Sequence, residues 1–288
     1  MADAKPTLMR RRLGLALRTL RQRSGLSLQE ASERLGMSGP PVLSKIENGK
    51  MRVQAAALDS YFVAYGVDDD QRKDEVRTLA RMASSSRGAN LFHQYRGAVR
   101  NPFADYLELE ELATQADLYA SQLVPGLLQT ADYAHAVIEG SGKWSTAREV
   151  RTFAELRMRR QQVLRRERAL AMWCILDEAA LRRRMGNAQV MSGQLRHLLD
   201  VAEELPGLNI QVLPFSAGAH SGVDGAFTVF RFDAGDPLAV VESLTTSQYL
   251  EEDEHVGRYD VTFNHLRARA LDIAPSRDFI TKLIKEEQ

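Results

Sequence analysis

Residues 25–49 read GLSLQEASERLGMSGPPVLSKIENG, a stretch in which short amphipathic segments alternate with glycines. Ser27 followed by Glu30 is a capping box, which satisfies free N–H groups and begins a helix that Gly36 ends. Proline is favoured at the first position of a helix and disfavours helical geometry in the residue before it, so Pro41 is expected to begin the next helix. The stretch therefore predicts two short helices joined by a tight turn.

The second of these helices has distinct inner and outer faces. Val42, Leu43 and Ile46 are spaced to face a core, which leaves a small polar face outside. Leucines at i, i+4 and i+7 predict a further helix before the pair, with its arginines, Arg21 among them, largely off the apolar stripe. Two more helices are predicted after the pair. Two short helices joined by a tight turn and supported by further helices match the helix-turn-helix arrangement.

A helix about 10 to 12 Å across fits the major groove of B-DNA, where its side chains reach base edges and flanking cations neutralise phosphates. Lys45 is the best candidate for direct readout because its ammonium can donate to O6 and N7 of guanine, whereas Ser44 suits either base type. Basic and amide residues beyond this helix, and arginines near the chain start, are better placed for phosphates. The candidate DNA-binding residues are Pro41, Ser44, Lys45, Asn48, Lys50, Arg52, Arg11 and Arg12.

Three parts of this region resemble the Xre (Cro/cI-type) helix-turn-helix family: residues 25–27 (Gly-Leu-Ser), residues 31–36 (from Ala31 to Leu-Gly) and residues 43–49 (Leu-Ser-Lys-Ile-Glu-Asn-Gly). The resemblance implies a five-helix, λ-repressor-like domain whose third helix reads operator DNA, usually as a dimer on a two-fold site. Leu28 replaces a Gln that contacts DNA in many members. The turn at residues 37–41 is one residue longer than the common form and contains two prolines.

The charge of the chain is divided along its length. Residues 1–66 carry eleven Lys and Arg against five Asp and Glu, a surplus of six positive charges, and the rest of the chain carries the opposite surplus. Such asymmetry indicates one segment that meets a polyanion. The length of 288 residues predicts two domains. We expect a DNA-binding domain at residues 1–85 and a regulatory or effector domain at residues 91–288, with a linker at about 84–90.

The region beyond this linker has mixed patterns. Helical periodicity predicts helices at about 104–121, 130–139, 146–167, 178–184, 188–204, 252–271 and 276–286. β-rich runs predict strands at 171–176, 209–214, 226–232 and 238–243. The second and third runs alternate, which suits antiparallel strands with one covered face. The expected fold class is α+β, with an all-α first domain and a larger domain in which helices pack a small, mostly antiparallel sheet.

Several segments of this region resemble the WhiJ-like family of antitoxin-like transcriptional regulators of actinobacteria. The matching segments are residues 122–133, 157–164, 175–182, 210–215 with 218–220, and 225–230. The resemblance implies a regulator that is often paired with a small partner protein encoded nearby. It provides no catalytic residues.

A few side chains of the larger domain are candidates for chemistry. His220, in a Gly-rich loop, could form an acid/base cluster with Asp177 and Glu178 at a strand end and with Glu242 on another strand, although such carboxylates are more often caps or ion-pair partners. The loop lacks the residues of a phosphate cradle, and no metal-ligand spacing or cofactor motif is found. We therefore expect no catalysis, no metal and no cofactor, and keep His220, Asp177 and Glu242 as candidates for a ligand.

The predicted helix at residues 146–167 is rich in arginine, including Arg159 and Arg160. A solvated outer face is the first interpretation of this helix. The alternatives are a docking surface for an acidic partner protein, or a second contact with the DNA backbone.

These patterns lead to one main hypothesis and two alternatives. The main hypothesis is a sequence-specific transcriptional regulator, a homodimer, whose second domain senses a small-molecule effector or a partner protein. The first alternative is an antitoxin-like module that sequesters a small partner and binds DNA for autoregulation. An enzyme is the least favoured. The single cysteine, Cys174, and the lack of a long apolar run predict a cytoplasmic protein without a membrane anchor.

Overall fold

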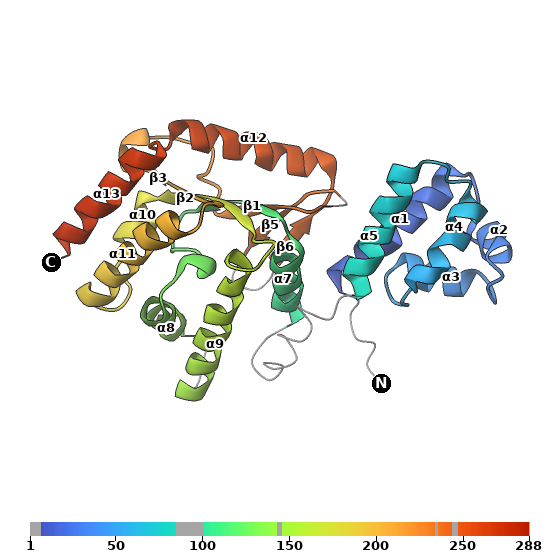
Figure 1. Cartoon of the computed structure of the whole chain (residues 1–288), viewed down its shortest axis with the longest axis horizontal. Helices are drawn as coiled ribbons and strands as arrows, with labels where there is room; N and C mark the ends of the chain where they lie inside the picture. Colours follow the sequence, from blue (N-terminus) through green and yellow to red (C-terminus); the bar gives the residue numbers. More distant parts are fainter. Residues whose placement is uncertain (1–6, 85–100, 143–145, 234–235, 244–246, 288) are drawn as a thin grey trace. The chain divides into compact units, whose positions relative to one another are not determined.

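The structure is a computed structural model that describes residues 7–84, 101–142, 146–233, 236–243 and 247–287. The chain divides into two compact units, of which the first holds residues 1–90 and the second holds most of the remainder (Figure 1). One unit is helical, and the other combines helices with a six-stranded mixed sheet. The predicted α+β class is confirmed. The predicted linker lies, apart from Ser84, outside the described residues.

The first unit is all-α, as expected. Its helices are α1 (Leu8–Arg23), α2 (Leu28–Arg34), α3 (Pro40–Glu47), α4 (Leu58–Tyr65) and α5 (Asp70–Ser84), with a short 3-10 helix at Ala55–Ala57. The leucines predicted to form the stripe of α1 lie in one core with Leu43 and Ile46 of α3 and with the aromatic rings of α4. Burial of this stripe holds α2 and α3 against α1 and α4.

The local signals at the ends of α2 have their predicted geometry. The Ser27 hydroxyl accepts from the N–H of Glu30, and the Glu30 carboxylate accepts from the N–H of Ser27, which completes the capping box. Gly36 ends the helix in a left-handed conformation with φ of 62°. Helix α3 begins at Pro40, one residue before the predicted start, because both prolines fit the first turn of a helix.

The second unit begins with α7 (Asn101–Leu112). Its strands are β1 (Gln115–Ala120), β2 (Ala171–Asp177), β3 (Leu208–Leu213), β4 (Phe227–Arg231), β5 (Leu238–Glu242) and β6 (Ser247–Leu250). Its other helices are α8 (Ala131–Gly140), α9 (Ala147–Arg160), α10 (Glu178–Arg182), α11 (Ala188–Glu204), α12 (Asp253–Arg269) and α13 (Ile273–Glu286), with 3-10 helices at Gly126–Leu128, Gln161–Leu164 and Phe215–Ala217. The four predicted strands are confirmed. Strand β6 was not predicted, and β1 lies where a helix was expected to continue.

The strands are ordered β3-β2-β1-β4-β5-β6. Strands β1, β2 and β3 are parallel, and the pairings of β4, β5 and β6 are antiparallel. The antiparallel, half-covered setting predicted for residues 209–214 is wrong, because β3 pairs in parallel with β2 and only Asn209 of the strand is not buried. Helix α12 covers one face of the sheet, and α8, α9 and α11 lie on the other (Figure 1).

Candidate nucleic-acid interface

Helix α3 presents the predicted faces. Leu43 and Ile46 are buried in the core of the first unit, and Pro41 and Lys45 are exposed. Ser44 is half-buried. The exposed strip is therefore narrow and carries one proline ring and one ammonium group, four residues apart along the helix.

Two glycines allow α1 to approach the end of α3 closely. A Cβ atom on Gly14 of α1 would lie 2.5 Å from the carbonyl oxygen of Glu47, a distance that real Cβ atoms do not tolerate. Gly49 has a φ of +69°, and a Cβ there would lie 2.9 Å from the backbone nitrogen of Arg11. Side chains at these positions would push α3 away from α1. The two glycines therefore allow α3, the candidate reading helix, to pack closely against α1.

A buried ion pair holds the same junction. The Arg21 Nε donates to Glu47 Oε1 at 2.7 Å and its Nη2 donates to Glu47 Oε2 at 3.1 Å, while Nη1 donates to the carbonyl of Leu26 at 2.8 Å. The hydrogen bond with Glu47 is the main cause of a raised pKa of Arg21. Burial, and then the charge of Glu47, raise the pKa of Tyr61 to about 12. The pair thus joins α1, the turn before α2 and the last residue of α3.

The position of Arg21 corrects the sequence interpretation. The pattern placed Arg21 largely off the apolar stripe of the first helix, but the residue is buried, with 7% of its surface exposed. Its burial is possible because Glu47 and Leu26 accept three of its hydrogen bonds. Glu47 belongs to the segment 43–49 of the helix-turn-helix resemblance, and its position here indicates that it supports α3 from inside.

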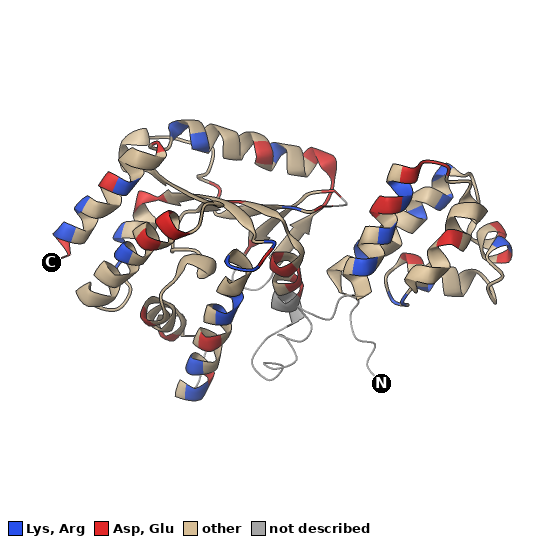
Figure 2. Cartoon of the chain, in the orientation of Figure 1, with Lys and Arg blue, Asp and Glu red and all other residues tan. Residues whose placement is uncertain are grey.

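Cations surround the exposed strip of α3. Lys45, Lys50 and Arg52 are exposed, and their side chains form no hydrogen bond or ion pair with residues that the structure describes. Figure 2 shows Lys and Arg residues on the segment after α3 and along α1. Their charges are therefore available to phosphate groups.

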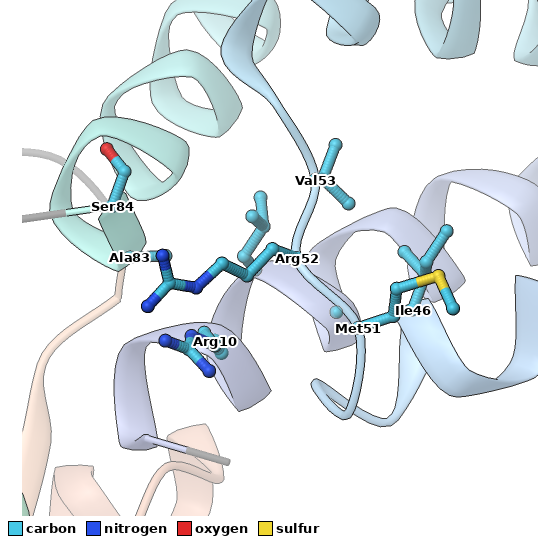
Figure 3. Close-up of a pocket in the computed structure, with 9 residues that line it drawn as sticks. Arg10, Ile46, Met51, Arg52, Val53, Ala83 and Ser84 are labelled. Carbon is cyan, nitrogen blue, oxygen red and sulfur yellow. The ribbon is translucent and has the colours of Figure 1, made fainter.

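Arg10 and Arg52 point into one small hollow beside the end of α5 (Figure 3). Its volume of about 20 Å³ is sufficient for a water molecule and too small for an organic ligand. Arg11 is half-buried, and Arg12 is buried, with 6% of its surface exposed. Arg12 was a candidate for phosphate contact, and it is not presented at the surface in this structure.

The side-chain amide of Asn48 forms hydrogen bonds within the first unit. Its Nδ2 donates to the Ser44 carbonyl at 2.7 Å and to the Ser44 Oγ at 3.3 Å, so it closes the last turn of α3. A phosphate contact by this amide, as the sequence predicted, would require breaking these bonds. Of the two predicted base-reading residues, Lys45 is exposed, whereas Ser44 is half-buried and its hydroxyl accepts from Asn48.

The second unit brings two of its three candidate residues together. His220 Nε2 lies 3.8 Å from Asp177 Oδ2, and Tyr119 donates its hydroxyl to the same oxygen at 3.0 Å. The His220 Nδ1 accepts from the N–H of Gly222 at 3.1 Å. These residues lie at the carboxyl ends of β1 and β2 and in the loop after β3. Because both ring nitrogens face groups of the protein, His220 is poorly placed to take a proton from a substrate.

Tyr119 was missed because its strand was predicted as helix. Burial and the charge of Asp177 raise the pKa of its hydroxyl. Glu242 does not join this group: it ends β5, is exposed, and its charge acts on Tyr106, Arg157 and Arg160. The grouping of His220, Asp177 and Glu242 is therefore wrong in its third member.

The Arg-rich helix is only partly a solvated face. Arg160 is buried and donates to Glu110 of α7 through Nε at 2.8 Å and Nη2 at 2.6 Å. Arg157 donates to Gln129 at 2.8 Å, whereas Arg159 is exposed. Arg160 is thus unavailable as a docking residue, because its guanidinium holds α7 to α9.

Two further features are absent from the described residues. No group of three or more His, Cys, Asp or Glu side chains is arranged to hold a metal ion among them. None of the helices in the described part of the chain is long and apolar enough to cross a membrane.

Comparison with known proteins gives a family for each unit. Residues 12–74 match a family described as "Helix-turn-helix domain". Residues 103–282 match a family described as "Domain of unknown function (DUF5753)". Neither the curated proteins nor the solved structures give a match. The helix-turn-helix match includes α2, α3 and the cations around them.

Proposed function

The chain belongs to the DUF5753 family and carries a helix-turn-helix domain ahead of that domain, and on this premise we propose that it is a cytoplasmic, sequence-specific transcriptional regulator. In this proposal the first unit is of the Xre (Cro/cI) type and reads operator DNA as a homodimer. The second unit is a WhiJ-like regulatory domain without catalytic activity, which senses a small molecule or a partner protein.

The exposed strip of α3 is the observation that carries the DNA-binding proposal. Lys45 projects from a helix whose other side is locked by Gly14 and by the Arg21–Glu47 pair, so the helix that carries its ammonium is held in a defined position. An exposed donor on a firmly held helix that fits the major groove is suited to direct readout. Lys50 and Arg52 beside it supply charge for the phosphates.

The proposal is tested by selecting bound duplexes from a random pool with the full chain, then measuring affinities. Lys45→Ala should weaken binding to the selected duplex by about tenfold and relax the preference at one base pair. Lys282→Ala removes the same charge from an exposed position of the second unit, and should leave the affinity unchanged. Equal binding to selected and random duplexes by the wild type would contradict sequence-specific recognition.

The second candidate function is antitoxin-like sequestration of a small partner protein. It is favoured by the loop after β3, where Phe215 and Val223 expose 60% and 72% of their surface. If the two side chains form one apolar patch, they would suit a protein partner. Co-purification from the native host should recover a small companion that a Phe215→Ser, Val223→Ser variant loses. Recovery of the wild-type chain alone would count against it.

A further inference from the structure

The first turn of α3 has an unusual chemistry for a helix that enters a groove. Residues 40 and 41 are both proline and have no N–H group, and Gly39 before them has no side chain to offer. The first N–H after the prolines, on Val42, donates to the Gly39 carbonyl at 3.1 Å. The turn therefore presents a ring of carbon atoms at Pro41 and no hydrogen-bond donor from either proline.

The N-terminal residues of a recognition helix are those that contact base edges in helix-turn-helix proteins. A proline ring cannot donate or accept there, so it discriminates between bases only by apolar contact. The major groove offers one apolar group in the unmodified duplex, the C5 methyl of thymine. Pro41 is exposed, whereas Pro40 is half-buried, so Pro41 is the ring that would meet it.

Pro41 and Lys45 lie on the same face of α3 because they are four residues apart. Four residues correspond to about 6 Å along a helix, or about two base steps of B-DNA. Resting on the proposed DNA-binding function, we propose that Pro41 and Lys45 act as a pair that reads a thymine methyl group and, about two base pairs away, a guanine. The half-site of the operator contains both bases.

Atomic substitutions in the DNA test this inference. In a duplex selected by the full chain, each thymine is replaced in turn by deoxyuridine, which removes only the methyl group, and each guanine by 7-deazaguanine, which removes only the N7 acceptor. One thymine per half-site should show a loss of affinity of about fourfold, the equivalent of one buried methyl group. A sensitive guanine should lie about two base pairs from it. Sensitive positions more than about four base pairs apart overturn the inference, because one helical turn cannot span them.

Protein variants then assign each contact. Pro41→Ser should bind the thymine and deoxyuridine duplexes equally, and Lys45→Met should bind the guanine and 7-deazaguanine duplexes equally. Pro40→Ala is the matched control, since it also removes a proline from the first turn but should keep the full thymine effect. A methyl effect that persists in Pro41→Ser, with the thermal unfolding midpoint unchanged, overturns the role of Pro41. Sequence-specific binding without any sensitive thymine overturns this inference alone, whereas absence of sequence-specific binding overturns the proposed function and this inference with it.

Discussion

Both units contain a buried arginine–glutamate pair joined by two hydrogen bonds, and the two pairs differ in what they support. Arg21–Glu47 lies in a small helical unit and fixes the end of α3. Arg160–Glu110 lies between α7 and α9, with the Arg160 guanidinium 5.5 Å from the Tyr106 ring centroid. Burial is the largest influence on the Arg160 pKa, which it lowers, and the charge of Glu110 opposes it, so that the pKa is raised overall. Similar pairs can therefore hold the candidate DNA-binding helix in one unit and join two helices in the other.

Removing the carboxylate of Glu110, in the Arg160–Glu110 pair, should have the largest effect on stability. Glu110→Ala leaves the Arg160 guanidinium buried with no bonded carboxylate, at a cost of about 5 kcal/mol in the free energy of unfolding. Chemical denaturation of the full chain measures this cost in the transition of the second unit. DNA affinity below that transition should change less than twofold. A parallel loss of DNA binding would contradict the separation of roles between the pairs.

Removing the carboxylate of Glu47 should lower the stability less and the DNA affinity more. Glu47→Ala is expected to destabilise the first unit by about 3 kcal/mol, since Arg21 is left with the Leu26 carbonyl as its acceptor. DNA binding should be lost under conditions where the unit remains folded, because the end of α3 is no longer tied to α1. The double variant Arg21→Met, Glu47→Leu is the control, since apolar replacement of a buried pair is often neutral. If the double variant is as unstable as Glu47→Ala, the cost does not come from an uncompensated charge.

The features that could be predicted from the sequence differ between the two units for a physical reason. The ends of α2 and α3 depend on capping residues, glycines and prolines within a few positions, and these were predicted to within a residue. The Arg21–Glu47 pair joins positions 26 apart and was not predicted. Strand β1 follows α7 without a glycine or proline and is buried on both faces, so its pattern does not alternate. The meeting of Asp177 with His220 depends on the parallel order of three strands, which the sequence pattern left open.

Replacing one helical glycine in each unit should have smaller effects on stability, which again differ between the units. Gly14→Ala places a Cβ against the Glu47 carbonyl and should cost about 1–3 kcal/mol of stability together with DNA affinity. Gly193→Ala in α11 is the matched change, and no atom of another segment lies within 4 Å of its added Cβ. It should stabilise the second unit by up to about 1 kcal/mol through helix propensity alone. Thermal unfolding of both variants checks the opposite signs, and equal signs would show that the approach of α1 to α3 is not as close as the structure has it.

Removing surface cations should change the stability least. The two units should then differ only in how the salt dependence of DNA binding responds. Lys50→Ala removes a charge beside α3 that no described residue pairs, so stability should be unchanged, while the slope of log affinity against log salt falls by about one. Arg165→Ala breaks a pair with Glu204 whose side chains are 38% and 59% exposed, and should alter stability by less than about 1 kcal/mol. Its salt slope should match that of the wild type, because its charge is already paired within the second unit. A reduced slope in Arg165→Ala would instead place the Arg-rich segment on the DNA backbone. The proposed division into a DNA-reading first unit and a regulatory second unit would then no longer follow the distribution of charge.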